Sequence, residues 1–169
     1  MAFTLHGAST STLVSNLKNL SAFLTKAEAS AQARGFDVAV LLGARLAPNM
    51  HPLVRQVQMA TDNATFTMAR LGGTDRPPFP DTETTIGELK DRIARAITYI
   101  ESIPAVDVDA SEDRMITFKA GPMDLSFTGG DYLTRWGLPN FYFHVTTAYA
   151  ILRHNGVDLG KRDFLMGGT

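Results

Sequence analysis

The sequence predicts an all-α fold: a four-helix bundle with a small β-hairpin inserted before the last long helix. Four long stretches of the 169-residue chain repeat apolar residues at steps of three and four, the spacing of one face of an α-helix. Such helices bury their apolar faces only against one another, which favours a bundle. We expect a single domain over residues 1–169, because this length suits one hydrophobic core.

The first long helix is predicted by a seam of six apolar residues: Leu13, Leu17, Leu20, Leu24, Ala27 and Ala31. The hydroxyls of Ser9 to Ser11 are candidates to cap its beginning, and Gly35 would end it. The short apolar segment from Phe36 to Leu42, with Asp37 as a possible cap, predicts one or two helical turns packed like a lid. A loop over Ala44 to His51 follows.

The second helix is predicted to begin with Pro52 and to end at Gly72-Gly73. Its buried stripe is Leu53, Val57, Ala60, Ala64, Met68 and Leu71. Three prolines and several acidic residues between Thr74 and Thr84 indicate an extended linker. The Thr85-Ile86-Gly87-Glu88 capping box begins a third helix that ends before Pro104. Its seam is Ile86, Leu89, Ile93, Ile97 and Ile100.

Residues 105–113 are acidic and lack a period, and a β-hairpin from Met115 to Thr128 follows with Gly121-Pro122 in its turn. Asp131 would cap a short helical turn. Pro139 would open the last long helix, which runs to Asn155. The tail carries four apolar residues that would dock on the bundle: Val157, Leu159, Phe164 and Leu165. The linkers are long enough for crossover connections, so periodicity does not give the topology.

Composition excludes several classes of function. Sixteen Lys and Arg against seventeen Asp and Glu leave no broad basic field, so we expect no nucleic-acid partner. The chain has no cysteine, which excludes disulfides, thiolate nucleophiles and Cys-based metal sites. No apolar run reaches about 18 residues and no signal peptide is visible, so we expect no membrane association and a cytoplasmic location. No phosphate-binding loop, dinucleotide motif or nucleophile elbow occurs, which disfavours nucleotide chemistry and standard serine hydrolysis.

His144 is the main candidate for chemistry, because it falls on the inward stripe of the last helix together with Phe141, Val145 and Ala148. A core histidine requires a polar partner across the bundle. It is then either a hydrogen-bonded structural residue, or a metal ligand or general base. A helical metal site usually takes a second donor at i+4, and that position is Ala148 here.

The other histidines have ordinary explanations. His51 precedes Pro52 at a helix start, where capping or solvent exposure competes with a ligand role. His6 lies near the terminus and would be solvated. His154 lies in the last turn of a helix, where cations oppose the helix dipole.

A polar set at Arg55, Gln58 and Asp62 on the second helix indicates a solvated face or the border of a cleft. In the second case Gln58 and Asp62 would approach His144, and the carboxylate would hold the tautomer of the imidazole and raise its pKa. Five aromatic residues gather near the last helix and would form core or dimer surface: Trp136, Phe141, Tyr142, Phe143 and Tyr149.

The stretch from Leu138 to Val157, followed by Leu159-Gly160-Lys161 and Asp163-Phe164-Leu165, resembles the C-terminal signature of an uncharacterised family in the DinB/YfiT-like superfamily of four-helix bundles. The segments Arg45 to Met50, Gln56 to Ala64 and Asp81 to Thr85 resemble its other motifs. The resemblance implies a DinB-like bundle over the whole chain.

Members of that superfamily include metal-dependent enzymes that act with low-molecular-weight thiols at a core site with three histidine ligands. The resemblance implies a pocket of that kind at His144. The chain departs from the ligand pattern at Ala148, and it carries His51 where the family resembled here often has an aromatic residue.

Three functions remain open at this point. The leading hypothesis is a bundle protein, expected to be a homodimer, that binds a small molecule in a core cavity around His144, Gln58 and Asp62 without a three-histidine metal site, and no cofactor is expected. The second is a metal-dependent thiol S-transferase or hydrolase that uses Zn or Ni, held by His144 with Asp62 and His51. The third is a structural or interaction protein that forms a homodimer.

Overall fold

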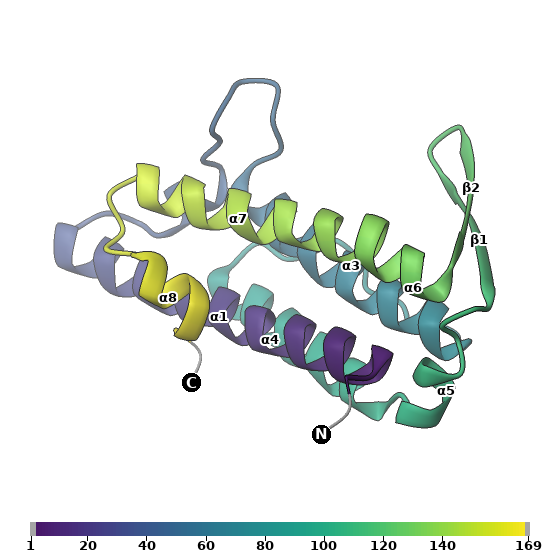
Figure 1. Ribbon diagram of the computed structural model, residues 1–169. Coiled ribbons are helices and arrows are strands. Elements are labelled where there is room, and N and C mark those ends of the chain that lie inside the picture. Colours follow the sequence, from purple (N-terminus) through teal and green to yellow (C-terminus); the bar gives the residue numbers. More distant parts are fainter. Residues whose placement is uncertain (1–2, 168–169) are drawn as a thin grey trace.

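Four long helices pack side by side with their apolar stripes turned inward in the computed structural model, which describes residues 3–167 (Figure 1). They are α1 (Leu5–Arg34), α3 (Leu53–Gly72), α4 (Ile86–Ser102) and α7 (Leu138–His154). Each contacts its neighbours around the bundle in the order α1, α4, α3, α7. The stripes predicted for α1 and α3 are entirely buried, which confirms the all-α bundle. The ends of the predicted domain, residues 1–2 and 168–169, lie outside the described residues.

The direction of each helix follows from contacts between distant residues. Helices α3 and α4 run parallel, because Arg92 binds Thr61 near the start of the pair and Ile103 lies against Gly72 at its end. Helices α1 and α7 are also parallel, since Phe23 contacts Tyr149 and Arg34 binds the Asn155 carbonyl further along. A parallel pair requires a connection that returns along the bundle, and residues 73–85 provide it.

The helix ends agree with the sequence in part. Gly35 ends α1 with a left-handed φ of 70°, and the capping box of Thr85 and Glu88 begins α4, both as predicted. The expectation that Ser9 to Ser11 cap α1 is wrong. The Thr4 hydroxyl accepts from the Gly7 N–H instead, and the Ser9 hydroxyl lies inside the helix, where it donates back to the Leu5 carbonyl.

Short helices pack on the bundle, among them α2 (Ala39–Leu42), α5 (Ala105–Asp109) and α8 (Lys161–Met166). The Asp37 carboxylate accepts from the Ala39 N–H at the beginning of α2, as predicted. Helix α5 was not expected from its aperiodic sequence. Tertiary contacts hold it, because Val108 is buried and Asp109 accepts from the His6 N–H at 2.7 Å. This contact leaves His6 half-buried, where the sequence suggested a solvated residue.

The tail docks on the bundle through α8, as predicted. Phe164 stacks on Phe23 at 6.2 Å between ring centroids and meets the edge of Tyr149 at 5.7 Å. The expectation for Leu165 is wrong, because this side chain is 60% exposed on the outer face of α8. Helix α8 has only six residues, and it packs one face against the bundle while Leu165 lies on the other face.

A β-hairpin projects from one end of the bundle, formed by β1 (Met115–Ala120) and β2 (Met123–Thr128) in antiparallel register (Figure 1). The chain then continues through α6 (Gly129–Tyr132) and a turn of π-helix, η1 (Leu133–Gly137), directly into α7. The Thr128 hydroxyl, not Asp131, caps this helical run. Pro139 therefore lies inside a continuous helix, and the wider π turn stands just before the residue that lacks an N–H.

No helix within residues 3–167 is long and apolar enough to cross a membrane. Trp136 lies partly buried against Phe118, so it offers little surface to a partner, whereas Phe143 on α7 is 57% exposed. The cytoplasmic location and the homodimer stay predictions.

Gly129 is expected to be indispensable for placing the hairpin. A Cβ at this position would lie 2.0 Å from the Ser111 carbonyl oxygen, so Gly129→Ala must push two backbone segments apart. We expect it to lower the free energy of unfolding by about 3 kcal/mol. Gly130→Ala is the control, since its Cβ would meet nothing nearer than 3.7 Å, and it should change stability by less than about 1 kcal/mol. Equal stability of the two variants in urea denaturation would contradict the importance of the close contact between Gly129 and the Ser111 backbone.

Candidate functional site

His144 is held inside the bundle by a neighbour on the facing helix. Its side chain is 6% exposed, and its Nδ1 lies 2.9 Å from the Oε1 of Gln56 on α3. The predicted polar partner across the bundle is therefore present. It is Gln56, which sequence reasoning did not single out.

The hydrogen bonds of Gln56 assign the tautomer of His144. The Gln56 side-chain amide donates from Nε2 to the His51 carbonyl at 3.1 Å, so its Oε1 faces the ring and accepts from Nδ1–H. The lone pair of His144 is therefore on Nε2. This atom makes no hydrogen bond within residues 3–167, and it keeps contact with solvent.

Burial, together with a smaller contribution from the nearby His51, lowers the pKa of His144 from 6.5 to about 4. The imidazole is thus neutral at physiological pH. A neutral Nε2 accepts hydrogen bonds well, but a pKa this low makes it a weak proton acceptor near pH 7.

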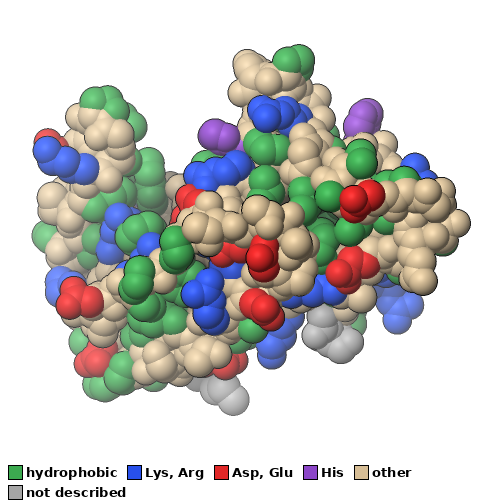
Figure 2. Space-filling view, turned by 180° about the vertical axis from the view of Figure 1, so that it is seen from behind, with side chains coloured by type: hydrophobic (Ala, Val, Ile, Leu, Met, Phe, Trp, Pro, Cys, Tyr) green, Lys and Arg blue, Asp and Glu red, His purple; other side chains and the backbone are tan. Residues whose placement is uncertain are grey.

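The free edge of His144 faces a pocket of about 270 Å³ between α3, α7 and the hairpin. Met59, Phe118 and Trp136 give it apolar walls, and Asn63 and Asn140 add amide groups. Asp62 also lines this pocket, so the structure brings together two of the three predicted site residues, His144 and Asp62. In the space-filling view the surface is hollowed between the projecting hairpin, at the upper left, and the body of the bundle (Figure 2).

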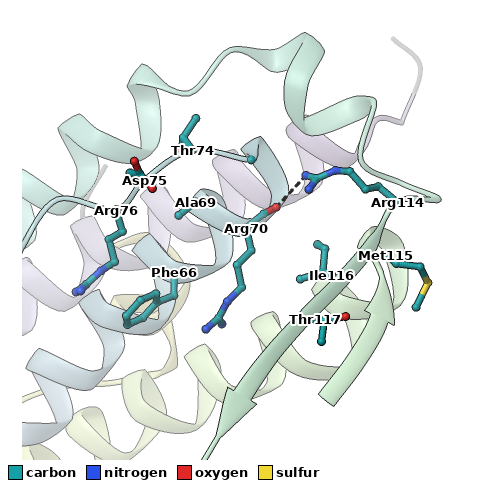
Figure 3. Close-up of a pocket in the computed structure, with 11 residues that line it drawn as sticks. Phe66, Ala69, Arg70, Thr74, Asp75, Arg76, Arg114, Met115, Ile116 and Thr117 are labelled. Atoms are coloured by element: carbon teal, nitrogen blue, oxygen red, sulfur yellow. Dashed lines mark hydrogen bonds between the residues drawn. The ribbon is translucent and has the colours of Figure 1, made fainter. Parts of the chain in front are cut away.

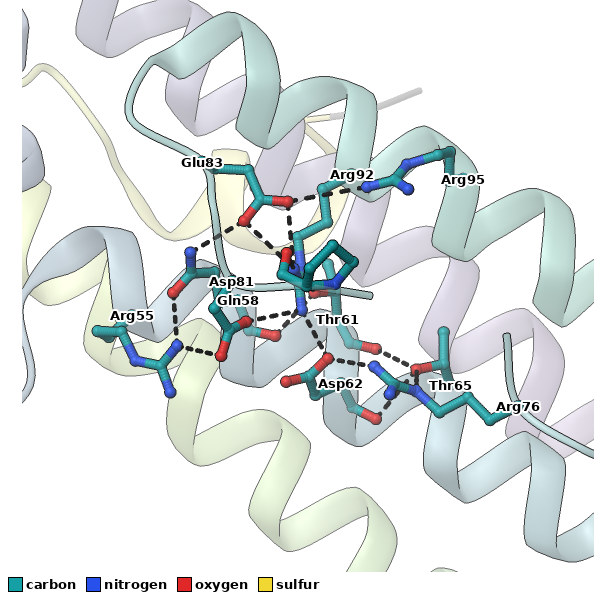
Figure 4. Close-up of polar contacts among 11 residues, drawn as sticks. Arg55, Gln58, Thr61, Asp62, Thr65, Arg76, Asp81, Glu83, Arg92 and Arg95 are labelled. Atoms are coloured by element: carbon teal, nitrogen blue, oxygen red, sulfur yellow. Dashed lines mark hydrogen bonds and ion pairs between the residues drawn. The ribbon is translucent and has the colours of Figure 1, made fainter. Parts of the chain in front are cut away.

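Gln58 belongs to a different cluster, centred on Arg92 of α4 (Figure 4). Its amide donates to Glu83 at 2.9 Å and its carbonyl accepts from Arg55 at 2.7 Å, so it does not approach His144. On the polar face of α3, Arg55 and Gln58 thus contact the linker, and only Asp62 borders the pocket at His144.

Arg92 is fully buried, and its guanidinium is surrounded by acceptors and carboxylates. It donates to the Thr61 hydroxyl at 2.6 Å, the Pro80 carbonyl at 2.9 Å, Glu83 at 3.1 Å and Asp62 at 2.6 Å, and it forms an ion pair with Asp81 at 3.1 Å. Sequence reasoning missed this residue. The signal was its position, three residues after Leu89 and four before Ala96, on the buried face of α4.

Asp62 is shared between Arg92 and Arg76, a residue of the linker. Partial burial raises the pKa of Asp62, while the two guanidinium groups act in the opposite direction. The carboxylate at the edge of the pocket is therefore already charge-compensated.

The residues around His144 do not fit the three-histidine metal site that the superfamily implies. Ala148 offers no donor one turn along α7, and His51 is exposed. The carboxylate of Asp62 is engaged by two arginines that would repel a cation. Among residues 3–167, no three His, Cys, Asp or Glu side chains form a group that could hold a metal ion. The metal content of the protein stays a question for elemental analysis.

Arg92→Met is expected to lower the free energy of unfolding by about 3–5 kcal/mol, because it leaves Glu83 and Asp62 without their buried counter-charge. Arg95→Met is the control on the same helix. Arg95 is 55% exposed and reaches Glu83 only at 3.8 Å, so its loss should cost less than about 1 kcal/mol. Urea denaturation measures both, and similar losses in the two variants would show that Arg92 is not the centre of the cluster.

His144 is expected to make stability depend on pH. Its pKa is lowered in the folded state, so between about pH 6.5 and pH 4 the unfolded chain binds a proton that the folded chain excludes. Acidification through this window should destabilise the fold by up to about 3 kcal/mol. His144→Asn keeps a side-chain N–H toward Gln56 but cannot titrate. The free energy of unfolding of this variant, measured in urea at pH 7, 5.5 and 4.5, should therefore lack the pH-dependent loss that His144 causes. His154→Asn, at the exposed end of α7, should behave like the wild type, and identical pH profiles for all three proteins would contradict the assignment.

Comparison with known proteins supports the architecture. The chain is similar to a crystal structure of a DinB family member protein from Shewanella denitrificans, with 42% sequence identity over 95% of this chain and 91% of that chain and a TM-score of 0.87. Comparison with functionally curated proteins finds no match. The resemblance to DinB-like bundles is thus confirmed. Residues 5–165 match the family model described as a domain of unknown function, DUF1993, and the chain belongs to that family.

Proposed function

We propose that this protein binds a small organic molecule in the pocket between α3, α7 and the hairpin, with Nε2 of His144 as the hydrogen-bond acceptor for the ligand. The observation that carries the proposal is a buried imidazole oriented by Gln56 whose second nitrogen has no partner within residues 3–167. A nitrogen with a free lone pair that faces a pocket can accept a hydrogen bond from a ligand in place of solvent.

The composition of the pocket supports this function. Apolar and polar side chains share its wall: Met59, Phe118 and Trp136 offer apolar contact, and polar groups converge between them, among them His144, Asn63 and Asn140. This combination is typical of sites that bury the body of a ligand and fix its orientation with few hydrogen bonds.

Metal-dependent thiol transfer or hydrolysis has less support, because the donor groups proposed for it do not assemble. Elemental analysis of untagged protein purified without chelators separates the two functions. Stoichiometric Zn or Ni would favour the metalloenzyme, and we expect neither.

Trp136 provides the measurement for ligand binding, since it is the only tryptophan in the sequence and lines the pocket. Neutral fragments that carry an N–H or O–H donor are screened by the shift of the Trp136 indole N–H signal in NMR spectra. We expect bound fragments to lose about tenfold in affinity in His144→Asn, the loss of roughly one hydrogen bond.

His154→Asn serves as the matched control and should leave the affinities unchanged, because His154 lies at the exposed end of α7, outside the pocket. The proposal is wrong if fragments bind His144→Asn as tightly as the wild type, or if no fragment shifts the indole signal.

A further inference from the structure

Arg70 of α3 is a half-buried cation that no carboxylate neutralises. Its side chain makes one hydrogen bond in the part of the chain that the structure describes, to the Tyr132 hydroxyl at 3.0 Å. No ion pair to it is found there within 4.0 Å. Arg92, one helix away, meets three carboxylates. The remaining N–H groups of Arg70 are thus available to another acceptor.

Aromatic rings lie close to this guanidinium. Its central carbon lies 4.1 Å from the centroid of the Phe118 ring on the hairpin and 5.1 Å from that of Phe66 on α3. Stacking against rings covers the faces of a guanidinium and leaves the N–H groups at its edge free for hydrogen bonds. Arg70 is therefore held in place by contacts that consume none of its donors.

Arg70 and Phe66 lie between two adjacent hollows and line both. One is the pocket at His144, and the other, about 420 Å³, lies between the end of α3 and β1 (Figure 3). Arg76 and Arg114 line the second hollow together with Asp75. The one other acidic residue lining these hollows is Asp62, and it is already paired with Arg76 and Arg92. The region around Arg70 is therefore positively charged, although the chain as a whole has a net charge of −1.

We propose that Arg70 binds the carboxylate of a small organic acid whose apolar body lies against Phe118 and Trp136. The inference rests on the proposed function, because it places the ligand in the same pocket, and it adds the chemical class of that ligand. A carboxylate presents two coplanar oxygens that match the edge of one guanidinium, and its negative charge compensates a guanidinium that makes no ion pair within residues 3–167. A donor group on the same molecule reaches Nε2 of His144 across the pocket.

Benzoate is the probe, and benzamide has the same shape without the charge. Binding is followed by the Trp136 indole signal. We expect benzoate to bind at least about tenfold more tightly than benzamide, because a charge-assisted bidentate contact exceeds a neutral one by that factor or more. Arg70→Gln should lower the affinity for benzoate by at least about tenfold and leave the affinity for benzamide unchanged. Arg153→Gln, on the exposed face of α7, is the matched control and should change neither.

Three results would overturn the inference: equal affinities of benzoate and benzamide, benzoate binding unaffected by Arg70→Gln, or displacement of benzoate by inorganic phosphate at equal concentration. The last would show a general anion site. Arg70→Lys keeps the positive charge but loses the planar edge of the guanidinium. Its affinity for benzoate should therefore lie between those of the wild type and Arg70→Gln. Thermal unfolding checks that all variants fold.

The two proposals fail separately. If His144→Asn weakens the binding of neutral fragments but Arg70→Gln does not weaken the binding of benzoate, the organic acid is refuted and the proposed small-molecule pocket stands. If Arg70→Gln weakens the binding of benzoate but His144→Asn does not weaken the binding of neutral fragments, the role of the imidazole is refuted and the carboxylate site at Arg70 stands.

Discussion

The burial of Arg92 is the constraint on which the rest of the structure depends. A fully buried guanidinium is tolerated only if every N–H has an acceptor and its charge is balanced. Helix α3 supplies two of the acceptors, Thr61 and Asp62, and the linker supplies the others. The linker must therefore return along the seam between α3 and α4, which makes these two helices parallel.

The same linker shapes the wall of the pocket. It brings Arg76 to Asp62, and the guanidinium of Arg76 lies 4.1 Å from the centroid of the Phe66 ring. Phe66 in turn contacts Arg70, which lies against Phe118 of the hairpin. An alternation of rings and cations thus connects the Arg92 cluster to the hairpin, so the cluster that holds the bundle together also orders the residues of the candidate site.

His144 shows how one buried polar residue combines a structural role with a free chemical group. Gln56 uses Nδ1, which satisfies half of the imidazole and fixes its tautomer. The other nitrogen faces the pocket, and burial keeps it unprotonated. The contact with Gln56 agrees with the interpretation of His144 as a hydrogen-bonded core residue, and the alternative, a metal ligand or general base, stays a prediction.

The sequence by itself determined what local pattern controls: the four apolar stripes, the capping box at Thr85, the hairpin and the inward direction of His144. These features depend on residues three or four positions apart, or on neighbours in a turn. Only the tertiary structure decided that His144 meets Gln56, 88 positions away, and that Gln58 turns to Glu83 instead. Neighbouring residues of one helix point to different faces, and which face meets which partner depends on helix directions that the linker and the buried Arg92 fix together.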